Sequence, residues 1–208
     1  MTQGLFITLE GIEGVGKTTQ VDYVAESFRR KNRTVTITRE PGGTSVGEAI
    51  REILLQGKDL DICDETELLL IFAARAQHLR RIIEPALARS EVVICDRFTD
   101  ASLAYQGGGR GIERARIHQL ISWLDGCVKP ELTLLLDAPV ETGLARAGRR
   151  GELDRFESET VEFFESIRQA YLDLAKEEPK RLVVIDASLG FDEVQEQIDA
   201  VLRNRHYL

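Results

Sequence analysis

Five short apolar runs divide the chain, and longer stretches with helical spacing separate them. The runs are continuous rather than alternating, which is typical of strands buried on both faces of a parallel sheet. They lie at residues 5–9, 34–38, 92–96, 132–137 and 182–186. The helical stretches cover about 17–31, 45–56, 65–89, 112–125, 140–147, 157–177 and 191–204. The alternation predicts a three-layer α/β fold, a five-stranded parallel sheet with helices on both faces.

No internal repeat, low-complexity tract or interdomain linker interrupts this pattern, so we expect a single domain over residues 1–208. The most polar stretch, 146–159, is too charged for a core and too short for a domain, and we expect a short arginine-rich lid at about 146–157. In such a sheet, ligands bind at the carboxyl ends of the strands. Residues that directly follow a strand are therefore the first candidates for function.

The first apolar run opens into the loop Gly11-Ile12-Glu13-Gly14-Val15-Gly16-Lys17-Thr18, which fits G-x-x-x-x-G-K-[ST]. Glycines let the backbone N–H groups of such a P-loop face phosphates, the lysine reaches the β- and γ-phosphates, and the threonine hydroxyl can bind Mg²⁺. A helix beginning at the loop adds its positive end, with Thr19 in its first turn. A chance match is on the order of one in a hundred for this length. The loop predicts nucleoside triphosphate binding and a P-loop NTPase-type fold.

Three further polar residues follow predicted strands. Asp96 and Arg97 come after the third strand, where a carboxylate can help to hold Mg²⁺ and an arginine can pair with a phosphate. Arg39 follows the second strand and precedes a Pro-Gly-Gly turn. The bland alternatives are a structural Asp–Arg pair and a solvated arginine on a surface turn.

A helix and a glycine-rich stretch offer side chains suited to a small polar ligand. Phe72 and Arg75 are three residues apart and share one side of the helix "ELLLIFAARAQHLRR". A ring beside a guanidinium can stack on a base and bond its carbonyl edge, although, taken alone, a core ring beside a surface arginine is the more usual explanation. Tyr105 and Gln106 begin the stretch 105–111, which we expect to be a polar loop.

The polar insertion concentrates four arginines, and phosphoryl transfer requires positive charge near the moving group. An arginine-bearing flap could supply that charge while excluding water as a competing acceptor. A solvated charge run at the start of a helix is the bland alternative. The four residues are Arg146, Arg149, Arg150 and Arg155.

The composition of the chain limits the classes of partner and the cellular location that we expect. The formal net charge of −8 argues against nucleic acid or an anionic membrane as the main partner. Three cysteines without a C-x-x-C pair fit reduced thiols in a cytoplasmic location, and the first apolar run is too short for a signal peptide or a membrane span. The three histidines show no metal-ligand spacing.

Together, the motifs resemble the thymidylate kinases, which transfer the γ-phosphoryl group of ATP to dTMP and so supply a step of dTTP synthesis. The resemblance extends over essentially the whole chain, through "FITLEGIEGVGKTTQ", "TREPGGT", "FAARAQH", "DRFTDASLAYQGGGRG", "LLLDAPVETGLAR" and "RRGELDRFE". The fourth of these is more specific than the P-loop. Family members form homodimers, so the resemblance also implies a homodimer.

The resemblance implies a role for each matching residue. Residues 11–19 would cradle the ATP phosphates, and Arg146 and the backbone at Ala187–Ser188 would lie near adenine. Asp96 would place Mg²⁺ with Thr18. The acceptor side would use the following residues, in chain order: Arg39 and Arg97 on the dTMP phosphate, Phe72 on thymine, Arg75 on its O4 edge, Ser102 and Gln106 around the base, and Tyr105 against the sugar 2′ position.

One departure concerns the stacking ring. Many family members place this Phe four residues before the arginine, whereas Phe72 is three before Arg75 and Ile71 takes the fourth place. The sequence therefore leaves open which side chain packs on the base.

The acidic Glu13 inside the P-loop fits the bacterial type within this family. One type carries a catalytic arginine in the loop, whereas the other has none there and uses lid arginines. Gly14 follows Glu13 here, so the resemblance assigns catalysis to Lys17, Arg97 and the lid residues Arg149, Arg150 and Arg155. Glu13 would accept a hydrogen bond from the dTMP 3′-hydroxyl or from an acceptor-side arginine.

Two other interpretations remain. One is a different small-molecule kinase on the same fold, for adenylate, cytidylate or a deoxynucleoside. The other is a P-loop switch or motor that binds a protein or nucleic acid, but no N-K-x-D guanine motif follows the later strands.

Overall fold

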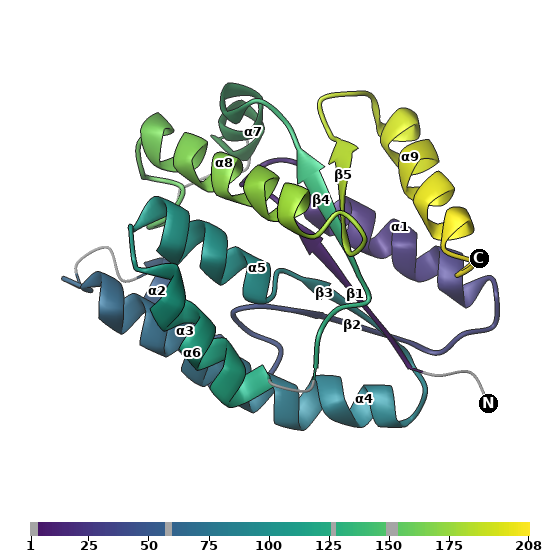
Figure 1. The fold of residues 1–208 in the computed structure, drawn as a ribbon, viewed down its shortest axis with the longest axis horizontal. Helices are drawn as coiled ribbons and strands as arrows, with labels where there is room; N and C mark the ends of the chain where they lie inside the picture. Colours follow the sequence, from purple (N-terminus) through teal and green to yellow (C-terminus); the bar gives the residue numbers. More distant parts are fainter. Residues whose placement is uncertain (1–3, 57–59, 126–127, 149–153) are drawn as a thin grey trace.

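The computed structural model describes residues 4–56, 60–125, 128–148 and 154–208. In this part of the chain, the strands form one parallel sheet in the order β2-β3-β1-β4-β5 (Figure 1). The strands are β1 (Leu5–Glu10), β2 (Val35–Arg39), β3 (Val92–Asp96), β4 (Leu132–Asp137) and β5 (Leu182–Asp186). The predicted five-stranded parallel sheet is confirmed, with boundaries within one residue of those expected.

Helices cover both faces of the sheet. On one face, α1 (Lys17–Arg29) packs on the central strands and on α9 (Phe191–Asn204). On the other, α8 (Val161–Glu177) packs on β4 and β5 and beside α5 (Thr99–Ser102). The remaining α-helices are α2 (Ser45–Gln56), α3 (Asp64–His78), α4 (Glu84–Ala88), α6 (Arg114–Asp125) and α7 (Val140–Ala147). This arrangement agrees with the rule that right-handed crossovers place helices on both faces.

The core confirms that the central strands are buried on both sides. Ile7 of β1 belongs to a large apolar cluster that includes Phe28 of α1. Its neighbour Phe6 belongs to a separate cluster with Leu79 and Ile83. All five side chains are fully buried or nearly so. Successive strand residues point to opposite faces, so a continuous apolar run is the pattern that such a strand requires.

The predicted helix over 65–89 is interrupted. A π-helical turn, η1 (Leu79–Ile83), separates α3 from α4. Pro85 lies in the first turn of α4 and has no N–H to donate to the carbonyl four residues earlier. The π-helical turn directly before it is a local widening of the kind that occurs at helix interruptions.

The prediction of a loop at 105–111 is wrong for most of its length. Residues Leu103–Gly109 form a second π-helical segment, η2, which packs closely on α8. A side chain at Gly108 would lie 2.7 Å from the Cβ of Ala170, and one at Gly109 would lie 2.5 Å from the ring of Phe163. These glycines permit close helix packing, and this use of glycine was misread as loop composition.

No helix in the described ranges combines the length and the apolarity that crossing a bilayer requires.

Candidate active site

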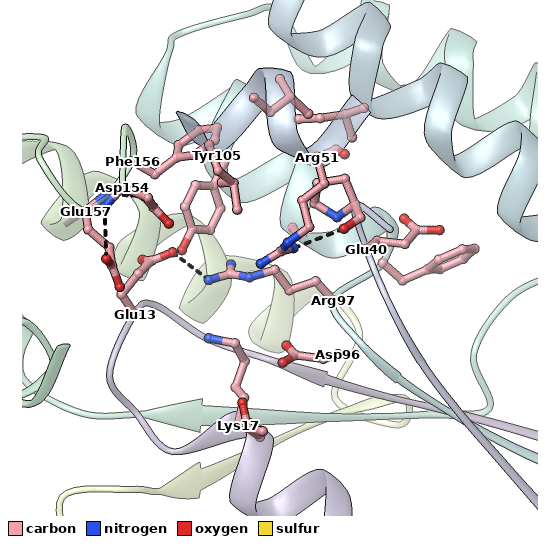
Figure 2. A pocket seen from close by; sticks show the side chains of 18 of the residues that line it. Glu13, Lys17, Glu40, Arg51, Asp96, Arg97, Tyr105, Asp154, Phe156 and Glu157 are labelled. Atoms are coloured by element: carbon pink, nitrogen blue, oxygen red, sulfur yellow. Dashed lines mark hydrogen bonds and ion pairs between the residues drawn. The ribbon is translucent and has the colours of Figure 1, made fainter. Parts of the chain in front are cut away.

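A cavity of about 380 Å³ lies at the carboxyl ends of the strands. Its wall includes the P-loop, the start of α1, parts of α2 and α3, the segment after β3, η2 and Arg146 of α7, together with Asp154, Phe156 and Glu157. This is the edge where parallel α/β sheets bind ligands. Figure 2 shows the side chains that point into the cavity.

The P-loop presents backbone and a buried lysine to the cavity. Gly14 and Gly16 have φ angles of 72° and 93°, the left-handed region that favours glycine. Lys17 begins α1, and its Nζ donates to the carbonyl oxygens of Gly11 (3.0 Å) and Ile12 (2.7 Å). Burial, followed by the charge of nearby Arg97, lowers the pKa of Lys17 to about 8. The loop therefore concentrates a lysine and a helix N-terminus at one end of the cavity.

Position 14 requires glycine for a steric reason as well as for its backbone conformation. A side chain there would overlap the carbonyl oxygen of Gly143 in α7. A side chain at Gly143 would lie 2.5 Å from the backbone carbonyl oxygen of Glu13. The two backbones touch, so the position after Glu13 has no room for an arginine. Any arginine that neutralises the transferred group must come from another segment of the chain.

Glu13 turns toward the far side of the cavity. Its Oε1 accepts from Arg97 Nη2 (2.7 Å), and its Oε2 accepts from the Tyr105 hydroxyl (2.6 Å). The Arg97 guanidinium also lies 4.5 Å from the centre of the Tyr105 ring. Burial alone would lower the pKa of Arg97, but Tyr105 and Glu13 raise it well above its usual value. Arg97 is therefore held in its charged form.

The backbone of Arg97 supports this placement. Its φ of 70° is unusual for a residue with a side chain, and such a conformation costs roughly 1–2 kcal/mol. Its N–H donates to the carbonyl oxygen of Leu9 (3.0 Å), which fixes the turn directly after β3. Strained residues of this kind gather where a side chain must be aimed.

Two buried polar atoms near the P-loop have no hydrogen-bond partner in the described part of the chain, namely Asp96 Oδ1 and Arg97 Nη1. A third group, the guanidinium of Arg51 in α2, points into the same space (Figure 2) and donates to the Pro41 carbonyl (3.0 Å). Unpartnered buried polar atoms are costly unless a ligand satisfies them. A carboxylate oxygen suits a hydrated cation, whereas two guanidinium groups suit a phosphate.

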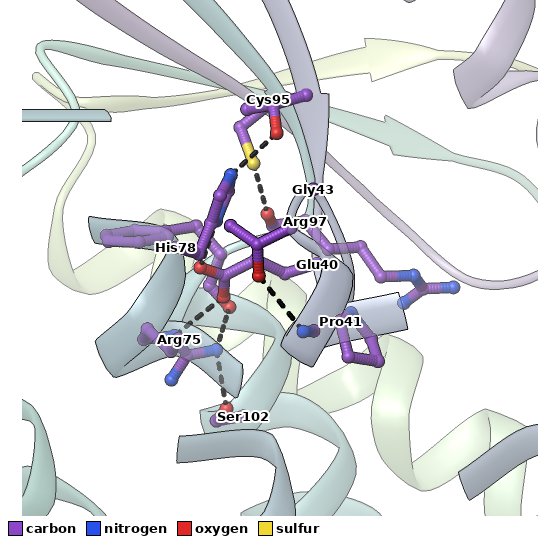
Figure 3. Close-up of polar contacts among 12 residues, drawn as sticks. Glu40, Pro41, Gly43, Arg75, His78, Cys95, Arg97 and Ser102 are labelled. Carbon is purple, nitrogen blue, oxygen red and sulfur yellow. Dashed lines mark hydrogen bonds and ion pairs between the residues drawn. The ribbon is translucent and has the colours of Figure 1, made fainter. Parts of the chain in front are cut away.

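Arg75 lies at the other end of the cavity, almost fully buried. It donates from Nε to Glu40 (2.6 Å) and from Nη2 to the Phe98 carbonyl and the Ser102 hydroxyl (both 3.0 Å). Its Nη1 has no partner in the described ranges (Figure 3). Gln106 lies nearby and donates from Nε2 to Glu67 (2.9 Å). This end of the cavity therefore offers a hydrogen-bond donor to a ligand.

The structure places two acceptor-side residues differently from the prediction. Phe72 is 3% exposed and belongs to the core, where its ring centre lies 4.6 Å from the Arg75 guanidinium, while Ile71 lines the cavity instead. Arg39 lies outside the cavity wall, and its exposed guanidinium pairs with Glu48 (2.8 Å). Arg51, rather than Arg39, lines the cavity.

The lid arginines have different outcomes. Arg149 and Arg150 lie outside the described residues. Arg155 is absent from the cavity wall, and it donates to Glu67 (2.5 Å) and to the Leu54 carbonyl (2.9 Å). Arg155 therefore ties the C-terminal part of the predicted lid to α2 and α3.

The structure brings Arg146 and the segment after β5 together, as expected. Arg146 lines the cavity, and its Nη1 donates to the Ala187 carbonyl (3.0 Å). The other expected residues on the cavity wall are Glu13, Gly14, Gly16, Lys17, Thr18, Thr19, Asp96, Arg97, Ser102, Tyr105 and Gln106. Gly11, Ile12 and Val15 complete the loop as buried or backbone elements.

Sequence reasoning missed three charged residues, Arg51, Glu40 and Glu67. Arg51 carried a readable signal, because it shares a helix face with Leu54 and Leu55, and all three line the cavity. One arginine on the inward face of an amphipathic helix is a candidate ligand-binding residue. Glu40 and Glu67 pair with residues that are distant in sequence, so no local pattern identified them.

Comparisons with known proteins agree with this geometry. A family model described as thymidylate kinase matches residues 9–198. A thymidylate kinase of Pseudomonas putida (strain GB-1) is 56% identical over 199 residues, covering 96% of this chain and 95% of that protein. A thymidylate kinase of Ectopseudomonas mendocina (strain ymp) is 56% identical with the same coverage. The crystal structure of thymidylate kinase from Ehrlichia chaffeensis matches with a TM-score of 0.79 and 35% identity, over 97% of this chain and 99% of that one. The chain belongs to the thymidylate kinase family.

Proposed function

We propose that this chain transfers the γ-phosphoryl group of ATP to dTMP, yielding ADP and dTDP. One observation carries the proposal. A single cavity holds a P-loop and, facing it, a second cationic site made by Arg51 and Arg97. Two phosphate sites in one cavity are what transfer between two nucleotides requires. Family membership supports ATP as the donor and dTMP as the acceptor.

The donor would bind along the P-loop. Backbone N–H groups of residues 11–19 would receive the phosphates, and Lys17 would leave the Gly11 and Ile12 carbonyls to reach them. Arg146 and the Ala187–Ser188 backbone would border adenine. This assignment uses the whole chain as one nucleoside monophosphate kinase domain.

The acceptor would bind between α2, α3 and η2. Arg51 and Arg97 would hold its phosphate, and Tyr105 would crowd the sugar 2′ position. Arg75 Nη1 would donate to the O4 of thymine, with Ser102, Gln106 and Ile71 around the base. The unpartnered donor at Arg75 supports a base with a carbonyl oxygen there.

Mg²⁺ fits the residues beside the P-loop. Thr18 offers a hydroxyl at the start of α1, and the buried, unpartnered Asp96 Oδ1 offers a carboxylate oxygen. Oxygen donors in small number, with phosphates supplying others, are typical of Mg²⁺ sites. When bound, Mg²⁺ would neutralise charge on the β- and γ-phosphates.

The transfer itself would need positioning more than proton transfer. The dTMP phosphate is already ionised, so its oxygen needs no general base to attack the γ-phosphorus in line. Lys17 and Arg97 would align the two phosphates and neutralise their charge. Because Gly14 leaves no room for an arginine in the loop, we assign the remaining positive charge to Arg149 or Arg150 of the lid.

We also propose a homodimer in the cytoplasm. Large apolar side chains are exposed on two helices, Leu69 on α3 (57%) and Trp123 on α6 (77%), and an interface between two copies would bury them. Sedimentation of the wild type and of Trp123→Glu tests the interface, because a charge there should shift a dimer toward monomer. The free Cys63 and Cys95 suit a reducing compartment.

The central test is a coupled assay of ADP release with ATP and dTMP, dUMP, AMP or no acceptor. We expect the highest kcat/KM with dTMP and almost no ADP release without an acceptor. Hydrolysis of ATP at the same rate with and without dTMP would sink the kinase proposal. A preference for AMP would instead indicate a kinase for a different nucleotide.

A further inference from the structure

The Arg75 guanidinium is fixed on almost every side. Glu40 holds Nε, and the Phe98 carbonyl and Ser102 hydroxyl hold Nη2. The guanidinium carbon also lies 4.6 Å from the ring centre of Phe72 and 5.4 Å from that of Phe98. Only Nη1 has no hydrogen-bond partner in the described part of the chain, although the side chain is 1% exposed.

Glu40 is itself held by a chain of buried groups (Figure 3). Its Oε1 lies 2.9 Å from His78 Nδ1, and His78 Nε2 lies 2.6 Å from the Thr38 hydroxyl. A carboxylate only accepts hydrogen bonds, so His78 Nδ1 donates to Glu40. In the neutral imidazole, Nε2 then accepts from the Thr38 hydroxyl. The bond to Thr38 therefore fixes the ring orientation in which Nδ1 of His78 donates to Glu40.

The turn after β2 packs against this chain of hydrogen bonds. Gly43 has a φ of 74°, and a side chain there would lie 2.6 Å from Thr38 Oγ1 and 2.8 Å from His78 Nε2. The Glu40 backbone N–H donates to the Asp96 carbonyl (2.9 Å), which ties this turn to the end of β3. The chain thus spans β2, the turn and α3, and it ends at the cavity.

We propose that Thr38, His78 and Glu40 are positioning residues that aim Arg75 Nη1 at the acceptor base. The inference rests on the proposed function and extends it to specificity. The aimed donor satisfies a carbonyl oxygen at position 4 of a pyrimidine and meets an amino group at that position as a second donor. A buried site built to donate discriminates by leaving polar groups unpaired with the wrong base. The Thr38-His78-Glu40 chain therefore sets the preference for dTMP over dCMP.

The test compares kcat/KM for dTMP and dCMP in variants of the chain. Removal of the His78 side-chain bonds in His78→Leu should lower the dTMP/dCMP ratio about tenfold, since about 1.4 kcal/mol corresponds to that factor. The loss should appear as a higher KM for dTMP, with kcat and the KM for ATP within about twofold of wild type. His78→Asn keeps a donor toward Glu40 and should restore most of the ratio.

Controls separate positioning from simple stability. Asp100→Asn weakens another buried ion pair, the one with Arg181 (2.6 Å), and should lower the melting temperature without changing the ratio. Thr38→Val removes one hydroxyl with little change of shape, and it serves if His78→Leu fails to fold. We expect about a threefold loss of the ratio for Thr38→Val, and Thr38→Ser should reverse it.

The outcomes also separate this inference from the proposed function. If Arg75→Ala collapses the ratio while every folded His78 and Thr38 variant keeps it, the positioning role is wrong and the base site stands. If Arg75→Ala itself keeps the ratio, the base site is wrong, and the positioning role is overturned with it.

Discussion

The two halves of the cavity are built in different ways. On the donor side, Lys17 bonds carbonyls five and six residues away, and the P-loop shapes itself with its own glycines. On the acceptor side, Arg97 pairs with Glu13 across 84 positions, and Arg75 pairs with Glu40 across 35. The proposed donor side is thus a local motif, in which Lys17 would have to leave the two carbonyls to bind phosphate. The acceptor side is assembled by the whole fold, with its arginines already aimed.

The largest expected effect comes from breaking the contact between the halves. Arg97→Ala removes a residue that we propose as a phosphate ligand, and it leaves the half-buried Glu13 without its cation. We expect kcat/KM for dTMP to fall by about 10³-fold, within the range for an arginine in phosphoryl transfer. Steady-state kinetics check this, with Arg39→Ala as the matched control. Among the described residues Arg39 pairs with the exposed Glu48 alone, so its loss should leave the KM for dTMP within about twofold.

A glycine pair tests the contact between the P-loop and α7. Gly14 and Gly16 both have positive φ, but only a side chain at Gly14 would overlap a backbone carbonyl, whereas nothing lies within 4 Å at Gly16. Both substitutions to alanine should cost roughly 1–2 kcal/mol of unfolding free energy from backbone strain. Gly14→Ala should cost at least about 1 kcal/mol more, because overpacking adds its own penalty. Urea unfolding without nucleotide measures the difference, and equal losses would contradict the close approach.

The substitution Arg155→Ala tests whether Arg155 stabilises the packing on α2 and α3 or takes part in catalysis. Its loss leaves buried Glu67 with fewer donors, so we expect the free energy of unfolding to fall by about 1–3 kcal/mol. We expect kcat to fall much less than in Arg150→Ala, which should lower kcat by at least about 10²-fold with little change in dTMP affinity. A large loss of kcat in Arg155→Ala, with unchanged stability, would return Arg155 to the catalytic set.

The smallest effect is a dependence on pH. The pKa of Lys17 is lowered to about 8 by burial and by Arg97, so the charged form is present below that pH and is lost above it. Because kcat/KM reports the free enzyme, kcat/KM for ATP should decline as the pH rises through about 8. A profile that stays flat to pH 10 would show that Lys17 keeps its charge. The same profile for dTMP at saturating ATP should change less.

The difference between the two halves of the cavity also explains which features could be predicted from the sequence. Strand burial, helix alternation and the P-loop are local patterns, so the sheet and residues 11–19 were predictable. The sequence left open whether Phe72 or Ile71 faces the cavity, because the rotation of α3 about its axis depends on how the helix packs. In the structure Ile71 lines the cavity. Arg39 was a candidate because it follows a strand, and Arg51 was not considered. The fold turns α2 so that Arg51 lines the cavity and Arg39 does not. The pairs Glu40–Arg75 and Glu67–Arg155 join distant segments, and one sequence gives no sign of them.

The contacts of Arg75 and Arg97 imply that the proposed acceptor side is assembled before the nucleotides bind. A crystal structure with dTMP and a nonhydrolysable ATP analogue tests it most directly. We predict that Arg75 keeps Glu40 and Ser102 and that Arg97 keeps Glu13, with backbone shifts of about 1 Å or less, while Lys17 leaves the Gly11 and Ile12 carbonyls for the phosphates. Thymine O4 should lie within hydrogen-bond distance of Arg75 Nη1. Two findings together would contradict an acceptor side assembled in advance: new partners for either arginine in the complex, and Lys17 still bonded to the Gly11 and Ile12 carbonyls.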